Sequence, residues 1–272
     1  VLAAQEPPLR VAVTSELDRR LGTRRLTARS VVASTLLGAD PPELPTRSLV
    51  GTAELFGIAP GTARVAMSRM VAAGELVATG DGYRLVGPAL LARQERQARS
   101  RRGASGPWDG TWHTLVVTAD TRPAAERVEL RTTLAAARFG ELREGVWLRP
   151  ANLADDPPAA PGCTRLRSEP HDPIALARSL WDLAGWTTRA QVLSREIGRL
   201  QPQLDAAEPG ALRDGFVVSA ATLRHFQADP LLPAGLLDAD WPGPALRHAY
   251  DRFDRAFRTT LATWQRAAHP RT

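Results

Sequence analysis

Apolar residues recur every three or four positions in three successive runs between residues 27 and 74. The first run opens at Thr27, a favourable helix N-cap, and ends at Gly38. A loop rich in proline follows, and the second run covers residues 46–56 before Gly57, which permits a tight turn. These patterns predict two helices, with a sharp turn leading into a third.

The third run, residues 60–73, has the sharpest division between apolar and polar sides. Pro60 suits a first helical turn because its missing N–H would have no partner there, and Gly74 suits the position after the last turn. One side carries an apolar stripe of Ala63, Ala66, Met67, Met70 and Val71. The other side carries Thr62, Arg64, Val65, Ser68 and Arg69.

A hairpin is predicted directly after this helix, because residues 76–79 and 83–86 flank Gly80-Asp81-Gly82. Two helices joined by a tight turn and followed by a hairpin are typical of a winged helix-turn-helix, which places a helix in a DNA groove. A small helical domain that binds another protein is the alternative interpretation of the same pattern.

The remaining pattern predicts two further domains. Strands are expected at residues 112–118, 142–148 and 163–166, with a helix at 123–139, which is half of a ferredoxin-like α+β domain. Helices are then expected at residues 174–186, 189–200, 211–227 and 245–268, with a proline-pinned apolar connector at 229–243.

The predicted fold class is therefore α+β multidomain. Its segments are a poorly ordered basic lead (1–26), a winged-helix DNA-binding domain (27–87), a basic helical linker (88–107), a ferredoxin-like central domain (108–170) and an α-helical C-terminal domain (171–272). The lead is basic through Arg10, Arg19, Arg20, Arg24 and Arg25. It is interpreted as a solvated tail, with an arm that touches phosphates as the alternative.

The charge distribution supports a polyanionic partner for the first part of the chain. All 35 basic side chains are arginines, and residues 1–107 hold 15 of them against 9 acidic residues, an excess of six. Residues 108–272 hold the other 20 against 20 acidic residues, so their net charge is zero. Arginine binds phosphate and guanine through two hydrogen bonds at once.

Each side chain expected at the DNA has a distinct role. Arg64 and Arg69 are predicted to contact guanine or phosphate, while Thr62 and Ser68 bind phosphates or base edges. Val65 is placed to touch a thymine methyl. The backbone contacts expected from outside this helix come from Ser48, on the preceding helix, and Arg84, on the hairpin.

Composition excludes several other classes. No run of about 18 apolar residues indicates a membrane span, and the first nine residues lack a secretory pattern. The single Cys163 forms no internal disulfide and no cysteine zinc site. These features favour a reducing cytoplasm, and no cofactor is expected.

No catalytic or metal-binding constellation is predicted. The five histidines, His113, His171, His225, His248 and His269, show no ligand spacing. Asp120 follows the first predicted strand of the central domain, but one carboxylate without a second beside it is a poor magnesium site. A metal-dependent nuclease is thus an alternative, and a non-enzymatic protein is the prediction.

The connector resembles the C-terminal signature of the PaaX family, which are transcriptional repressors of phenylacetate catabolism and their relatives. The residues that carry it are Asp229-Pro230-x-Leu232-Pro233 and Leu236-Leu237-x-x-Asp240-Trp241-Pro242-Gly243. Further family motifs occur in the same order at residues 27–30, 62–71, 108–112, 145–150 and 180–183.

The resemblance implies a dimer on a palindromic double-stranded DNA operator, with no membrane partner. It also implies release by an effector such as phenylacetyl-CoA or another acyl- or aryl-CoA. Candidate effector contacts are the anion-binding side chains Arg149, Arg165 and Arg167 and the aromatic side chains Trp181 and Trp241.

Overall fold

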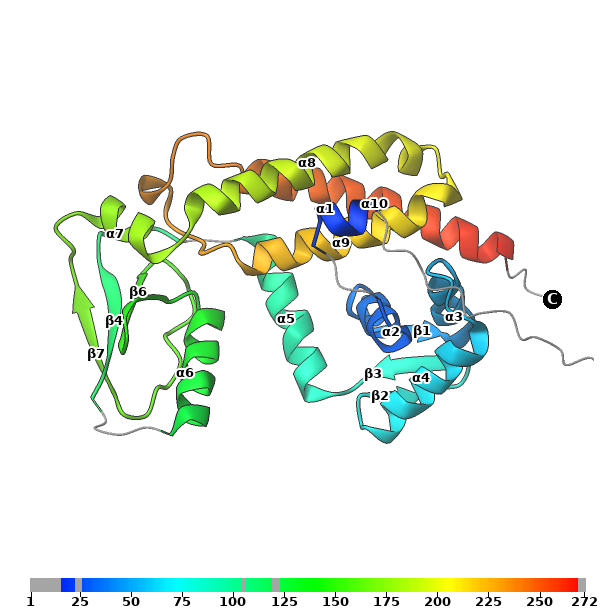
Figure 1. Ribbon diagram of the computed structural model, residues 1–272, viewed down its shortest axis with the longest axis horizontal. Coiled ribbons are helices and arrows are strands. Elements are labelled where there is room, and N and C mark those ends of the chain that lie inside the picture. The colour runs from blue at the N-terminus through cyan, green and yellow to red at the C-terminus, as the bar shows by residue number, and fades with distance from the viewer. Residues whose placement is uncertain (1–15, 23–25, 104–105, 119–122, 269–272) are drawn as a thin grey trace, which may run out of the picture. The chain divides into compact units, whose positions relative to one another are not determined.

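The computed structural model describes residues 16–22, 26–103, 106–118 and 123–268 (Figure 1). These residues form both α-helices and β-strands. The elements are α1 (Glu16–Arg20), α2 (Ala28–Leu37), β1 (Glu43–Pro45), α3 (Thr46–Glu54), α4 (Pro60–Ala72), β2 (Leu76–Ala78), β3 (Gly82–Leu85), α5 (Pro88–Arg102), β4 (Trp112–Val117), α6 (Ala124–Ala136), β5 (Gly140–Arg143), β6 (Val146–Pro150), β7 (Cys163–Ser168), α7 (Pro173–Leu180), α8 (Leu183–Asp205), η1 (Pro209–Ala211), α9 (Leu212–Gln227), η2 (Ala234–Leu236) and α10 (Gly243–Ala268).

The chain divides into two compact units. We call the first the N-terminal unit; it lies within Val1–Gln94, Gln203–Ala221 and Ala256–Thr272. The second, the central unit, comprises Glu95–Pro202 and Thr222–Arg255. Helices α5, α8, α9 and α10 each contribute residues to both units. Each of the five predicted segments is continuous in sequence and stays a prediction. Each compact unit, in contrast, is formed by segments that are far apart in the chain.

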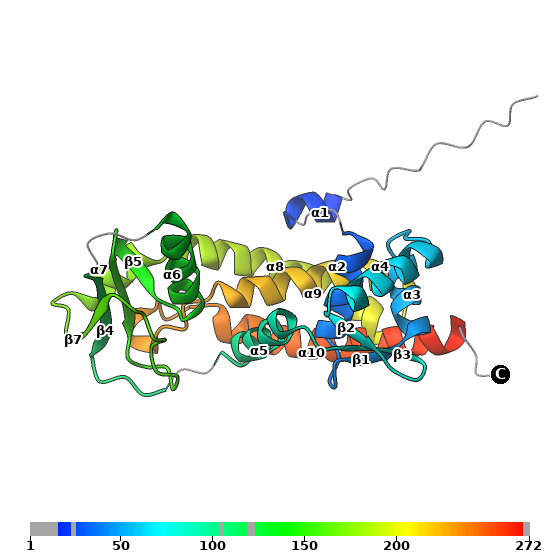
Figure 2. The ribbon, with the colours of Figure 1, turned by 90° about the horizontal axis from the view of Figure 1, so that it is seen from below.

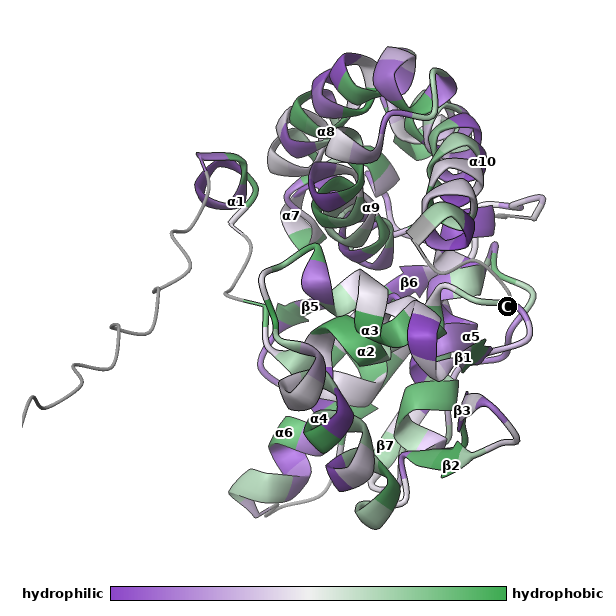
Figure 3. Cartoon of the chain, turned by 90° about the vertical axis from the view of Figure 1, so that its right-hand side faces the viewer, coloured by the Kyte–Doolittle hydropathy of each residue, from purple (hydrophilic) through white to green (hydrophobic). Residues whose placement is uncertain are grey.

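The N-terminal unit has a core between three helices and a small sheet. Helices α2, α3 and α4 pack on one another, and the antiparallel strands follow the order β1-β3-β2. In Figure 3 the hydrophobic colour gathers on α2 and α3. Thr27 caps α2 as predicted, because its hydroxyl accepts the backbone N–H of Ser30. Leu76 and Leu85 are register partners and close the core from the sheet side.

Helix α4 buries only the middle of its predicted apolar stripe. Ala63 and Met67 are fully buried and Met70 is 2% exposed. Gly74 ends the helix in the left-handed region at φ 68°, and the next N–H returns to the Met70 carbonyl. Val71 was expected in the stripe but lies at its edge and is 37% exposed.

Two parts of the N-terminal unit differ from the sequence-based expectation. Strand β1, just before α3, adds a third strand to the predicted hairpin. Helix α1 is folded where poor order was expected, with Leu17 and Leu21 buried and Asp18 paired to Arg213 of α9 at 2.8 Å. The predicted basic lead also includes Arg10, Arg24 and Arg25, which lie outside the described residues.

The central unit is built on an antiparallel sheet in the order β5-β6-β4-β7, with helices on both faces (Figures 1 and 2). Leu134 of α6 packs against Leu115 and Trp147 on one face. Trp112 and Leu148 contact Ala177 of α7 and the short helix η2 on the other. The strands predicted at 112–118 and 163–166 are present as β4 and β7, but the strand predicted at 142–148 is wrong: residues 144–145 are the turn between β5 and β6. Residues 151–162, which join β6 to β7, form a loop rather than a helix.

The helices predicted at 174–186 and 189–200 correspond to α7 and α8, but the break between them lies at residues 181–182 instead of 187–188. Helix α7 ends at Leu180 because Trp181 is extended, at φ −134° and ψ 140°. Helix α8 then starts at Leu183, and the Asp182 carboxylate accepts the Gly185 N–H at 2.8 Å. Periodicity missed the break because an N-cap aspartate is compatible with a continuous apolar stripe.

The buried stripe of α4 predicts a large loss of stability when Met67 is truncated. Met67→Ala should lower the free energy of unfolding by about 2–5 kcal/mol, since the cavity left behind collapses only partly. Urea denaturation followed by circular dichroism measures the loss. Val71→Ala, on the exposed side of the same helix, is the matched control and should change stability by less than about 0.5 kcal/mol. Equal losses in the two variants would contradict the orientation of α4.

Candidate functional site

The outer side of α4 presents all five side chains that the periodicity places there. Thr62, Ser68 and both arginines are exposed, and Val65 is 52% exposed. Among the described residues, no hydrogen bond or ion pair engages the guanidinium of Arg64 or Arg69. The surface therefore offers two unengaged cations, two hydroxyls and one methyl-bearing side chain on a rigid helix.

Ser48 does not share this surface, so its predicted phosphate contact is corrected. Its side chain is only 8% exposed in α3, and its carbonyl accepts from Thr52 at 2.8 Å. The amide of Gln265, near the end of α10, reaches the same carbonyl at 3.3 Å. The C-terminal helix thus covers the part of α3 that was expected to meet DNA.

Arg84 lies in the middle of the small sheet, on the face opposite to Leu85. Its register partners are Glu43 on β1 and Val77 on β2. The guanidinium is 53% exposed and sits 3.8 Å from the Glu43 carboxylate, a surface ion pair that a phosphate can displace at little cost. Arg29 pairs more closely with Glu75, just before β2, donating to both oxygens of its carboxylate.

The predicted effector arginines are not brought together with the predicted tryptophans. Arg149 is 2% exposed and donates to the carbonyls of Ala137 and Asp155, so it anchors the loop after β6. Arg165 donates to the Pro157 carbonyl of the same loop. Arg167 is exposed on β7 opposite His113. Burial and these arginines, Arg149 first, lower the pKa of His113.

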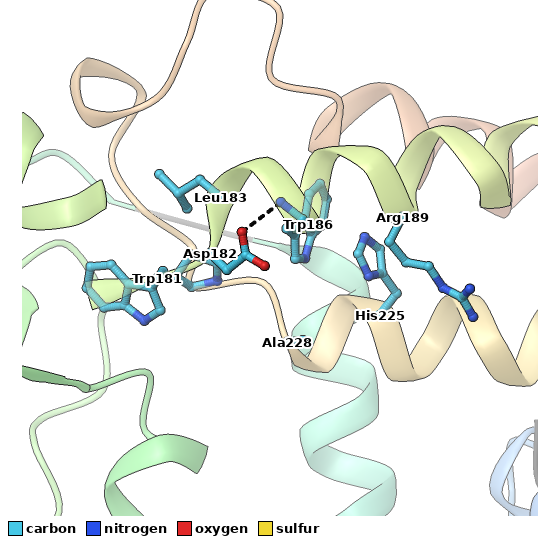
Figure 4. Close-up of a pocket in the computed structure, with 9 residues that line it drawn as sticks. Trp181, Asp182, Leu183, Trp186, Arg189, His225 and Ala228 are labelled. Atoms are coloured by element: carbon cyan, nitrogen blue, oxygen red, sulfur yellow. Dashed lines mark hydrogen bonds between the residues drawn. The ribbon is translucent and has the colours of Figure 1, made fainter. Parts of the chain in front are cut away.

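Trp181 lines a cavity between α8, α9 and the start of the connector (Figure 4). The cavity has a volume of about 270 Å³. Trp241 is not in the lining, but it stacks on the lining residue Trp186 with ring centroids 4.4 Å apart. His225 stacks on Trp186 at 4.2 Å. The full lining is Trp181, Asp182, Leu183, Gly185, Trp186, Arg189, His225, Ala228 and Pro230.

His225 is the member of this cavity that sequence reasoning missed. No motif surrounds it, and only the packing of α8 on α9 reveals its neighbours. Burial lowers its pKa to about 4, which outweighs the opposing effect of Asp229. The imidazole is therefore neutral at pH 7.

The described residues hold no group of three metal-ligating side chains. Asp120, on which the nuclease alternative depends, lies outside the described residues, as does His269. Cys163 is half-buried at the start of β7. None of the described helices combines the length and the apolar composition needed to cross a lipid bilayer.

Three family models match the chain in sequence order. The PaaX-like protein model matches residues 27–88, the PaaX protein central Cas2-like domain matches 105–160, and the PaaX-like protein C-terminal domain matches 181–266. The chain is also similar to a solved structure, "Uncharacterized protein Rv0674 from Mycobacterium tuberculosis", with 45% identity over 88% of this chain and 99% of that chain and a TM-score of 0.70. No curated protein matches significantly.

The depressed pKa of His225 predicts a pH-dependent stability. The folded protein keeps this imidazole neutral down to about pH 4, whereas the unfolded chain binds a proton near pH 6.5. The free energy of unfolding is therefore unaffected by this histidine above about pH 6.5. It decreases as the pH falls from 6.5 towards 4, because the unfolded chain gains a proton that the folded protein does not. Phenylalanine does not titrate, so His225→Phe lacks this loss. The free energy of unfolding of the variant minus that of the native protein should therefore be about 2 kcal/mol more favourable at pH 5 than at pH 7.

Urea denaturation of both proteins at pH 5 and 7 measures this difference. His248→Phe is the matched control, because His248 is exposed on α10. That variant should keep the pH dependence of the native protein. A native-like pH dependence in His225→Phe as well would show that another group is responsible.

Proposed function

The chain belongs to the PaaX family, and from this premise we propose that it is a DNA-binding transcriptional regulator rather than an enzyme. Helix α4 acts as the recognition helix and enters the major groove of a double-stranded operator. Binding represses the operon, in keeping with the phenylacetate-catabolism regulators for which the family is named. The single observation that carries the proposal is the exposed outer side of α4, with two guanidiniums that no described residue engages.

We assign the N-terminal elements to a winged helix-turn-helix. In support, α3 and α4 are joined by a turn in which Gly57 has φ 69°, and β2 and β3 follow α4 as an antiparallel hairpin. The central sheet is assigned to a ferredoxin-like domain. Its strand order and the crossover of α6 between β4 and β5 support this, with a loop in place of the second crossover helix.

The DNA contacts divide by chemistry. Arg64 and Arg69 bind guanine edges or phosphates, and Val65 contacts a thymine methyl. Thr62 lies in the first turn of α4, where backbone N–H groups without helical partners also favour a phosphate. Arg84 exchanges its weak contact with Glu43 for a phosphate beside the groove.

The working form is a homodimer whose two α4 helices occupy successive major grooves of a palindromic site. Release follows from an effector that binds the DNA-free geometry better than the bound one. The family makes an acyl- or aryl-CoA such as phenylacetyl-CoA the first effector to test.

Removing the two unengaged cations should weaken binding to the DNA upstream of the protein's own operon. Arg64→Ala and Arg69→Ala should each cost about 1–3 kcal/mol of binding free energy if they contact bases, because a bidentate guanine contact is worth that much. Mobility shifts at fixed salt measure the affinity, and competitor DNA of scrambled sequence separates base reading from phosphate contact.

Arg195→Ala provides the matched control, because this arginine is exposed on α8 and its loss changes the net charge equally. Its affinity should stay within about twofold of the native protein. Unchanged DNA affinity in both α4 variants would contradict the assignment of α4 as the recognition helix. A native protein that binds a partner protein but no upstream DNA would favour the interaction-module alternative.

A further inference from the structure

Four basic side chains meet on the face of the central sheet that packs against α6. On β4, His113 lies directly opposite Arg149 of β6 and Arg167 of β7. Arg165 precedes Arg167 by two residues, so both side chains point to the same face. Leu115, two residues after His113, packs against α6 and identifies that face. The sheet register therefore gathers three guanidiniums around one imidazole, beside the edge strand β7 (Figure 1).

No carboxylate hydrogen-bonds these three guanidiniums among the residues that the structure describes. Arg149 donates to two backbone carbonyls. Arg165 donates from one nitrogen to the carbonyls of Pro157 and Pro158, which fixes its position and leaves its other nitrogens for a further partner. Arg167 has no hydrogen bond to any described residue. Because like charges that face each other across strands repel, an anion would stabilise the cluster.

Three carboxylates lie close by without pairing with the cluster. Asp109 accepts the backbone N–H and the hydroxyl of the threonine two residues further on, and Asp155 pairs with Arg99 at 3.0 Å. Asp156, exposed in the loop after β6, favours a protonated His113. Burial and the three arginines outweigh it and lower the pKa of the imidazole. His113 is therefore mainly neutral at pH 7 in the free protein.

Three of the four side chains are within reach of a ligand. Arg165 and Arg167 are exposed. His113 is half-buried, its ring nitrogens are not enclosed, and it has no hydrogen bond to a described residue. Arg149, only 2% exposed, lies beneath them and adds positive potential without touching a ligand.

The spacing of the three accessible side chains fits a tetrahedral anion. Alternate residues of a strand lie about 6–7 Å apart, and directly opposed residues of antiparallel neighbours lie about 4.5–5.5 Å apart. A phosphomonoester offers three terminal oxygens, one each for Arg165, Arg167 and His113, whereas a carboxylate offers two. Its second negative charge also favours the protonated imidazole, which donates where the neutral ring can accept.

We propose that this corner of β4 and β7 is a binding site for the dianionic phosphate group of a small phosphomonoester. Arg165 and Arg167 donate to two of its oxygens. His113 takes up a proton from solvent on binding and donates to the third. The assignment goes beyond the function proposed above, and it does not rest on DNA binding.

Methyl phosphate and dimethyl phosphate test the site in the full-length protein at pH 8. The monoester is a dianion with three terminal oxygens, whereas the diester is a monoanion with two. Chemical shifts of the backbone amides of β4 and β7, followed in NMR titrations, measure both affinities. Native protein should bind the monoester at least about tenfold more tightly. Equal affinities would favour a nucleic-acid backbone as the source of the phosphate and overturn the proposal.

Arg167→Ala should weaken the binding of methyl phosphate at least about tenfold, because it removes a charge-assisted hydrogen bond at an exposed position. Arg143→Ala is the matched control, because Arg143 is exposed on β5, the other edge of the same sheet, and its loss changes the net charge equally. Its affinity should stay within about twofold of the native protein. Unchanged affinity in Arg167→Ala, equal losses in the two variants, or no binding by native protein would each overturn the site.

Sulfate, which stays a dianion from pH 6 to pH 8, tests the role of His113. Because the bound dianion favours a protonated ring, native protein should bind sulfate at least about threefold more tightly at pH 6 than at pH 8. His113→Gln keeps a hydrogen-bond donor but does not titrate, so its affinity should change by less than about 1.5-fold. The same pH dependence in both proteins would overturn proton uptake at His113. None of these titrations contains DNA, so a negative result leaves the proposed regulator untouched.

Discussion

The arrangement of the N-terminal unit depends on the burial of one narrow seam on α4. Ala63, Met67 and Met70 are enclosed by α2 and α3, and a rotation of the helix would expose two methionines and bury a guanidinium. Either change costs several kcal/mol, so the outward direction of Arg64 and Arg69 follows from core packing. The surface proposed to meet DNA is therefore rigid before any partner arrives.

Arginine has a second, structural use in the central unit. Arg101 bridges Asp251 and Asp254 of α10 and lies over the Tyr250 ring, while Arg247 binds Asp229 and α5. Arg149 holds the loop after β6 through backbone carbonyls. Each guanidinium has several donors in a fixed plane, so a single side chain can join two or three segments. Arg149 is consequently unsuited to the effector contact that the family resemblance had implied for it.

Beside the aromatic cavity, in contrast, two buried ring nitrogens, Nε1 of Trp186 and Nε2 of His225, have no hydrogen-bond partner among the described residues. Stacking of Trp241, Trp186 and His225 fixes the ring positions and removes water from the imidazole, which keeps it neutral at pH 7. A neutral imidazole accepts a hydrogen bond where a protonated one could only donate.

The sequence by itself determined the local elements, because helix periodicity, N-caps and glycine turns act within a few residues. It placed α4 and its exposed side, the hairpin, and the strands β4 and β7, but it read the β5–β6 hairpin as one strand. It did not reveal the end of α7 at Leu180, the burial of Ser48 under Gln265, or the joining of His225 to Trp186. Those features depend on contacts between residues far apart in the chain, and only the tertiary structure decides which distant side chains share an interior.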